Sequence, residues 1–181
     1  MVALVTPAVQ RLMDVDHRPM AEWISSIPFE EWPQQTRLAD GKIRPAMVND
    51  LRWRGFDQAR SGPATKIGTS SELALALALM EGGIGVRGGN VRLTGFMLSV
   101  VMPGHSIDPH RDDQIHGWLT RVHVPLLTNP WAFFDVHDDG NRRYQMEAGR
   151  AYLVDVMRRH AVSNNGQTPR VHFMFDVFTQ R

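Results

Sequence analysis

From Asn90 onward the chain is a succession of β-type runs, and this pattern limits its possible folds more than any other feature. The runs are VRLTGFMLSVVM, WLTRVHVPLL, WAFFDVH, RRYQM, AYLVDVM and PRVHFMFDVF. Turn-forming segments separate them, namely PGHSIDP, TNP, DDGN, EAG and SNNGQTP. Six short strands at this spacing predict a β-sandwich or barrel rather than a parallel sheet.

The first half of the chain is expected to supply helices that support one face of this β structure. A short helix is predicted after Asp16, because Pro19 then falls in the first turn and Pro28 ends the helix. Its predicted apolar face consists of Met20, Trp23, Ile24 and Ile27. A second, buried helix is predicted for the run SELALALALM, which begins with the capping box Thr69–Glu72.

The 181 residues are enough for one domain, with a support region over residues 1–89 and a core over residues 90–181. Lys and Arg together number 20 and Asp and Glu number 19, so the formal net charge is +1. This balance argues against nucleic acid or an anionic membrane as the main partner. The sequence shows neither a membrane-spanning run nor a typical signal peptide, so a cytoplasmic location is expected.

The chain has no cysteine, so a metal ion would have to be held by His, Asp or Glu side chains. His110 and Asp112 lie two residues apart and would project to the same side of an extended segment. His160 follows the run AYLVDVM. Two histidines and one carboxylate form the facial triad of non-haem Fe(II) oxygenases, which leaves three coordination positions for a co-substrate and O2.

Two arginines lie near this candidate triad in the sequence. Arg170 opens the last β-type run, and Arg121 shares one face of an earlier run with His123. Each arginine alone is more often part of a salt bridge, but two on an apolar β framework are costly unless they meet an anion. A guanidinium can hold a carboxylate through two parallel hydrogen bonds, so 2-oxoglutarate, an iron-chelating dicarboxylate, is a fitting partner.

Together these segments resemble the aspartyl/asparaginyl β-hydroxylase family, whose members are Fe(II)/2-oxoglutarate-dependent dioxygenases. The resemblance covers about residues 90–178, in SVVMPGHSIDPHRD, TRVHVPLLTNP and GRAYLVDVMRRHAVSNNGQTPRVHFMFD. Within it, PHRD, RVH and TPRVH also resemble bacterial proline cis-4-hydroxylase. The implied fold is a mainly β, cupin-like jelly roll, or double-stranded β-helix, with supporting N-terminal helices.

The resemblance also implies roles for individual residues. It implies three catalytic residues that ligate Fe(II), namely His110, Asp112 and His160. It implies four side chains that bind 2-oxoglutarate, namely Arg121, His123, Arg170 and Ser99. In the implied reaction, O2 converts 2-oxoglutarate to succinate and CO2 while a C–H bond of an amino acid or amino-acyl residue becomes a hydroxyl group.

The sequence leaves several alternatives open. Proline could be the substrate, or the chain could bind a metal or a small acid without turnover. A structural or assembly protein would require the spacings to be coincidental. The substrate could be a free amino acid, a peptide, a protein side chain or a carrier-bound residue, and the oligomeric state is unknown. His172 is expected near Arg170 on the last strand, without a role as an iron ligand.

Overall fold

The computed structural model of this protein describes residues 7–26, 35–37, 43–45, 47–48, 91–112, 118–138 and 140–179. These residues form one helix, α1 (Arg18–Ser25), and twelve strands. The strands are β1 (Val9–Asp14), β2 (Gln35–Arg37), β3 (Ile43–Pro45), β4 (Met47–Val48), β5 (Val91–Val101), β6 (His105–His110), β7 (Trp118–Leu127), β8 (Ala132–Val136), β9 (Arg142–Tyr144), β10 (Arg150–Val154), β11 (His160–Asn164) and β12 (Arg170–Thr179). The helix predicted to begin at Thr69 lies outside the described residues.

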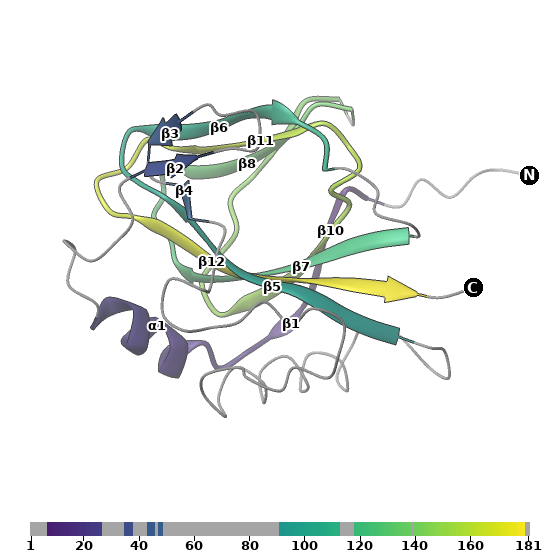
Figure 1. Ribbon diagram of the computed structural model, residues 1–181, viewed down its shortest axis with the longest axis horizontal. Coiled ribbons are helices and arrows are strands. Elements are labelled where there is room, and N and C mark those ends of the chain that lie inside the picture. Colours follow the sequence, from purple (N-terminus) through teal and green to yellow (C-terminus); the bar gives the residue numbers. More distant parts are fainter. Residues whose placement is uncertain are drawn as a thin grey trace, which may run out of the picture.

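Two antiparallel sheets dominate the molecule. The larger has six strands in the order β1-β10-β7-β12-β5-β4, and the smaller has four in the order β6-β11-β8-β9. Strands β2 and β3 form a separate pair. Figure 1 shows the smaller sheet lying over the larger one, with strands from distant parts of the chain side by side. The expected fold class, a mainly β jelly roll, is confirmed.

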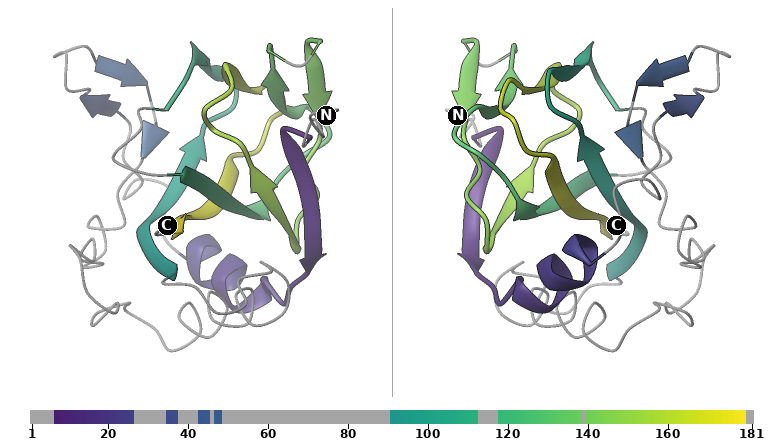
Figure 2. Two further views of the ribbon diagram at one scale, coloured as in Figure 1. Left: turned by 90° about the vertical axis from the view of Figure 1, so that its right-hand side faces the viewer. Right: turned by 90° about the vertical axis from the view of Figure 1, so that its left-hand side faces the viewer.

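The N-terminal helix contributes to the core from outside the larger sheet. The Arg18 backbone N–H donates to Asp16 Oδ1 at 3.3 Å, as expected of a residue that caps a helix. Met20 and Ile24 are buried against apolar residues of the larger sheet. Figure 2 shows α1 below that sheet, away from the smaller one. The Trp23 side chain and Ile27, also predicted for this apolar face, lie outside the described part of the chain.

The coverage by α1 explains the pattern of β12, which reverses the usual order of an apolar inner face and a polar outer face. Val171, Phe173 and Phe175 point outward and belong to the cluster that packs with α1. The alternate residues Arg170 and His172 are just as buried but face the smaller sheet. Because the apolar residues of the outer face pack in one cluster with α1, the inner face can carry polar groups without leaving the sheet short of apolar contacts.

The strands that were not expected from the sequence include β1, β6 and β11. β6 and β11 are short and polar, and β6 contains Pro109, so both resemble turns when read alone. Their extended conformation comes from pairing, because β11 lies between β6 and β8 and bonds to both. A second apolar cluster, which includes Phe134, Val154 and Val162, fills part of the space between the two sheets.

In the part of the chain that the structure describes, no helix has the length and apolar character needed to cross a lipid bilayer.

Candidate active site

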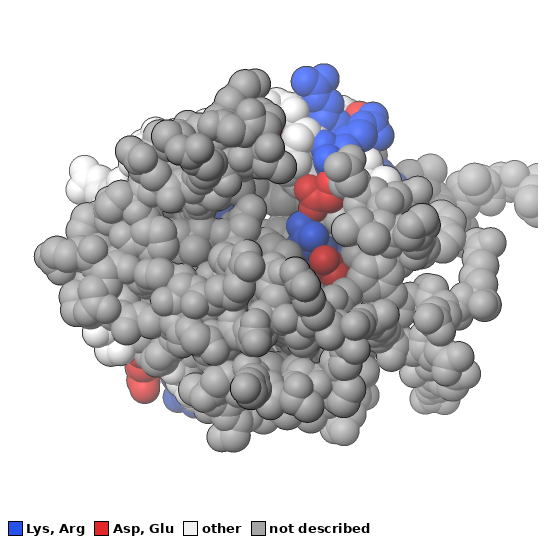
Figure 3. Space-filling view, in the orientation of Figure 1, with Lys and Arg blue, Asp and Glu red and all other residues white. Residues whose placement is uncertain are grey.

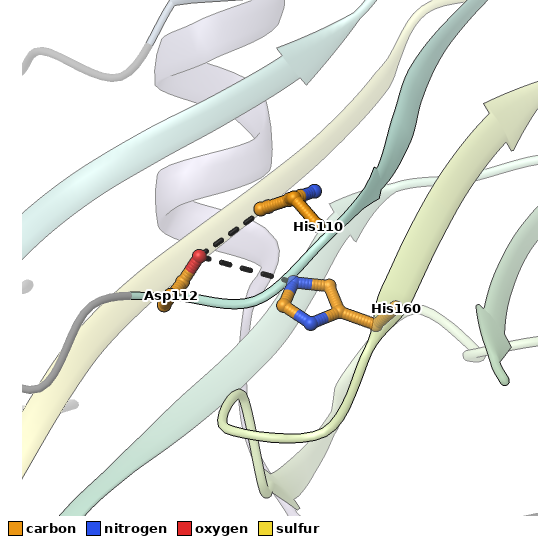
Figure 4. A group of neighbouring side chains, drawn as sticks. All are labelled: His110, Asp112 and His160. Atoms are coloured by element: carbon orange, nitrogen blue, oxygen red, sulfur yellow. Dashed lines mark ion pairs between the residues drawn. The ribbon is translucent and has the colours of Figure 1, made fainter. Parts of the chain in front are cut away.

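The three predicted metal ligands come together at one end of the smaller sheet. His110 on β6 and His160 on β11 are directly opposite each other, and their rings lie 4.4 Å apart between centroids. Asp112 follows two residues after His110, and its backbone N–H donates to the Val156 carbonyl at 3.1 Å. One ligand atom from each residue lies within 4.8 Å of the others. Figure 4 shows the three side chains converging.

Backbone carbonyls set the orientation of both imidazole rings. His110 Nδ1 lies 2.7 Å from the Asp108 carbonyl oxygen, and His160 Nδ1 lies 2.8 Å from that of Arg158. A carbonyl only accepts, so each Nδ1 carries the proton and each Nε2 presents a lone pair. These Nε2 atoms lie 3.3 Å and 4.0 Å from Asp112 Oδ1.

This donor set fits a divalent metal ion. Two imidazole lone pairs and a carboxylate oxygen repel one another unless a cation lies between them. Burial alone would raise the pKa of Asp112, but the contacts with His110 and the charge of Arg121 outweigh it and hold that pKa below its usual value. Burial lowers the pKa of His160, which favours the neutral imidazole that a metal requires.

A cavity of about 80 Å³ lies beside the triad, between the two sheets. All seven predicted site residues line it, namely Ser99, His110, Asp112, Arg121, His123, His160 and Arg170. Its apolar walls are Ile107, Phe134, Val156, Val162 and Met174. At roughly 10–15 Å³ for each water molecule, the space holds several waters. Residues from five separate segments of the chain therefore converge on one cavity.

Arg170 is almost completely buried, with 2% of its surface exposed. Its Nη2 donates to His172 Nδ1 at 3.0 Å, whereas Nη1 has no hydrogen-bond partner among the described residues. No carboxylate in the described part of the chain forms an ion pair with it, and burial lowers its pKa to about 9. A buried cation without a counter-charge is strongly unfavourable, so this side of the cavity is suited to an anion.

Two buried histidines extend this polar region. His123 lines the cavity, and its Nδ1 lies 3.5 Å from that of His172. Desolvation, together with the charge of Arg170, lowers the pKa of both histidines well below the usual value, so both are neutral. Ser99 is opposite His172 on the neighbouring strand and is also buried. The sequence placed His172 near Arg170 but did not indicate their hydrogen bond.

Arg121, in contrast, already has acidic partners. Its Nε and Nη2 donate to the two carboxylate oxygens of Asp176 at 2.6 Å and 3.1 Å. Its Nη1 donates to Asp112 Oδ2. Asp176 was not identified from the sequence. The available signal was its position in PRVHFMFD, six residues after Arg170 on the same face of an extended strand.

The solved structures with a similar fold include three at low sequence identity. The non-haem α-ketoglutarate-dependent epimerase SnoN from nogalamycin biosynthesis is 16% identical with a TM-score of 0.54, covering 94% of this chain and 78% of its own. AviO1 from Streptomyces viridochromogenes Tue57 is 13% identical with a TM-score of 0.53, covering 94% and 89%. A 2OG-Fe(II) oxygenase family oxidoreductase from Burkholderia pseudomallei is 13% identical with a TM-score of 0.50, covering 94% and 67%. These likenesses support the fold.

Family membership is shown by a sequence comparison rather than by these structural likenesses. No curated protein matches the chain. The model of the aspartyl/asparaginyl β-hydroxylase family matches residues 28–180, which include every site residue predicted above. The match agrees with the resemblance seen in the second half of the chain and extends it into the first half. The chain therefore belongs to the aspartyl/asparaginyl β-hydroxylase family of hydroxylating dioxygenases.

Proposed function

We propose that this protein hydroxylates an amino acid or amino-acyl residue with Fe(II), 2-oxoglutarate and O2. In this proposal His110, Asp112 and His160 hold the iron, and the metal supplies the chemistry that activates O2. The atoms balance because 2-oxoglutarate loses CO2 and takes one oxygen atom to become succinate. The second oxygen atom enters the substrate as a hydroxyl group.

The observation that carries the proposal is the buried Arg170 in the same cavity as the triad. A 2-oxoglutarate molecule that chelates the metal through its 2-oxo acid needs a cation at its far carboxylate. Arg170 supplies this positive charge, and its Nη1 has no hydrogen-bond partner among the described residues. Two parallel hydrogen bonds from a guanidinium suit a carboxylate better than any other common anion-binding group of a protein.

Ser99 and His123 complete the proposed co-substrate site. Ser99 lines the cavity and can donate its hydroxyl to the same carboxylate as Arg170. His123 is neutral, so it can offer a hydrogen bond without adding a second positive charge. Its Nε2 has no partner among the described residues. Phe134 lies edge-on to His123 and stacks on His160, so it forms an apolar wall beside both imidazoles.

The proposal can be tested before the substrate is known. Anaerobic titration of the protein with Fe(II) and 2-oxoglutarate should produce a weak visible charge-transfer band with one site per chain. The His160→Ala variant should lack the band, and pyruvate, which has no distal carboxylate, should bind far more weakly than 2-oxoglutarate. A wild-type protein that shows no saturable metal site would overturn the proposal.

The substrate class is tested separately. Succinate release and the gain of one oxygen atom should be followed by mass spectrometry with amino acids, peptides and carrier-bound amino-acyl groups. We expect an amino acid or amino-acyl compound to couple the two products one to one. Metal and 2-oxoglutarate binding without a coupled product in any of these classes would instead support the binding-protein alternative.

A further inference from the structure

We infer that Arg121 is a positioning residue, held by Asp176, that fixes the carboxylate of Asp112 for metal binding. The inference rests on the proposed function, because it takes Asp112 to be a metal ligand. It assigns Arg121 a role different from the co-substrate contact that the family resemblance implies. It also gives Asp176, which the sequence did not single out, a place in the site.

The pairing between Arg121 and Asp176 fixes the plane of the guanidinium. Arg121 on β7 and Asp176 on β12 are direct cross-strand partners. Both carboxylate oxygens of Asp176 accept from Arg121, so the contact is a two-point fork rather than a single bond. Only 15% of the Arg121 side chain and 11% of the Asp176 side chain are exposed, so solvent weakens the contact little.

The remaining terminal nitrogen of this guanidinium, Nη1, contacts Asp112, the proposed metal ligand. Arg121 Nη1 donates to Oδ2 of Asp112, while Oδ1 of Asp112 faces the Nε2 atoms of His110 and His160. One oxygen of Asp112, Oδ2, is thus held by Arg121, and the other, Oδ1, is directed toward the proposed metal position. Second contacts of this kind set the orientation and basicity of a metal ligand.

Asp112 needs such an anchor because of its place in the fold. It lies two residues beyond the end of β6, so strand pairing does not set its side chain. Arg121 and Asp176 belong to the larger sheet, so their contact with Asp112 crosses the gap between the sheets. Figure 3 shows basic atoms between acidic atoms in a hollow of this face.

The charges of this trio also suit a metal site. Asp112 and Asp176 bring two negative charges and Arg121 one positive charge, so the group carries a net charge of −1 that a divalent cation offsets. Three of the five N–H groups of Arg121 are already used by the two carboxylates. Arg170 has no acidic partner among the described residues and is the better candidate for the co-substrate anion.

A double-mutant cycle on metal affinity tests this inference without turnover. Apo-protein would be titrated with Co(II), and binding followed by visible absorption, for wild type, Asp176→Asn, Asp112→Ala and the double variant. We expect Asp176→Asn to weaken Co(II) binding roughly 10-fold in the wild-type background, as mutations of outer contacts to a ligand do. In the Asp112→Ala background the same change should have no further effect, because its target is gone.

The chain offers a matched control in Arg143 and Asp135. They are also cross-strand partners, on β9 and β8, with the same fork at 2.7 Å and 3.1 Å, but Arg143 is exposed. Asp135→Asn should leave Co(II) affinity unchanged. If Asp176→Asn does not fold by circular dichroism, Arg121→Lys replaces it, because lysine keeps the charge but loses the fork.

Three other outcomes of these titrations would contradict the inference or the proposed function. An equal loss of Co(II) affinity in both backgrounds would overturn the inference, because Asp176 would then act independently of Asp112. Unchanged Co(II) affinity with weaker 2-oxoglutarate binding would return Arg121 to the co-substrate contact. If wild-type protein bound no Co(II), the proposed function itself would fail, whatever the variants did.

Discussion

Arg170 carries a positive charge although only 2% of the residue is exposed to solvent. Its neighbour His172 is neutral and accepts one hydrogen bond from Nη2, which orients the guanidinium but does not neutralise it. The desolvation free energy of this buried charge is offset only when an anion enters the cavity and pairs with it. At the scale of a single residue, the proposed function therefore explains why this chain retains a buried charge that lowers its stability.

The first prediction concerns replacement of Arg170 by lysine. A lysine offers a point charge and cannot form two parallel hydrogen bonds, so Arg170→Lys should weaken 2-oxoglutarate binding by about 2 kcal/mol, or roughly 30-fold. Metal affinity should stay the same, because Arg170 does not touch the triad. The measurement is a 2-oxoglutarate titration of the metal-loaded protein under anaerobic conditions, with Co(II) affinity followed separately.

Two comparisons strengthen this experiment. Arg170→Ala should be worse than Arg170→Lys, because the carboxylate would then be buried without any partner. Pyruvate, which lacks the distal carboxylate, should bind wild type and both variants about equally. Equal 2-oxoglutarate affinity in all three proteins would show that Arg170 does not hold the co-substrate.

At the scale of the elements, three of the correctly predicted strands, β5, β7 and β12, have strong apolar alternation. β5, β7 and β12 carry their apolar residues toward α1, and this pattern alone placed Arg121 with His123 on one face, as the structure shows them. β6 and β11 lack this pattern. Their extended conformation comes instead from hydrogen bonding between strands of the smaller sheet, which their own sequences do not indicate. The candidate ligands His110 and His160 were recognised by residue type and spacing, without knowledge that they lie on paired strands.

The same reasoning explains what the sequence missed in the candidate site. Asp176 is an ordinary acidic residue in a strand until the register places it opposite Arg121. Cross-strand register cannot be read from one strand alone, since it depends on the twist and bulges of the whole sheet. Relative to β7, which carries Arg121, β12 contains such an irregularity between Val171 and His172.

The second prediction separates the support by α1 from the chemistry of the cavity. Ile24 is fully buried against the outer face of the larger sheet, so Ile24→Ala should lower the free energy of unfolding by roughly 2–4 kcal/mol. Metal and 2-oxoglutarate affinity should be unchanged, because α1 lies on the opposite face of that sheet from the cavity. Denaturant unfolding and the two titrations would measure both effects.

A control on the same helix is available. Glu22 is exposed, so Glu22→Ala should change the free energy of unfolding by no more than about 0.5 kcal/mol. If Ile24→Ala instead reduced ligand affinity at unchanged stability, α1 would have to be coupled to the cavity through the sheet. That outcome would contradict the separation of the outer apolar face from the inner polar face.

At the scale of the whole molecule, the two sheets enclose a space that is apolar in one part and polar in another. The polar part contains two buried neutral histidines, His123 and His172, beside the charged Arg170. In the unfolded chain these histidines are solvated and titrate near their usual pKa of about 6.5. In the folded protein, burial and the neighbouring charge keep them from taking up a proton until a much lower pH.

The last prediction is that this difference makes the fold sensitive to mild acid. Below about pH 6.5 the unfolded state binds more protons than the folded state, so the free energy of unfolding falls as the pH falls. Each such histidine contributes up to about 1.4 kcal/mol for each pH unit. His172 is the better probe, because it is not one of the residues lining the cavity, and the groups facing it are Arg170 on its own strand and His123 on β7. Denaturant unfolding of metal-free protein between pH 7 and pH 5 should therefore show a smaller slope for His172→Gln than for wild type, whatever the stability of the variant at pH 7. Identical slopes would mean that His172 takes up its proton equally well in the folded protein, so that Arg170 would have lost the neutral acceptor that orients it.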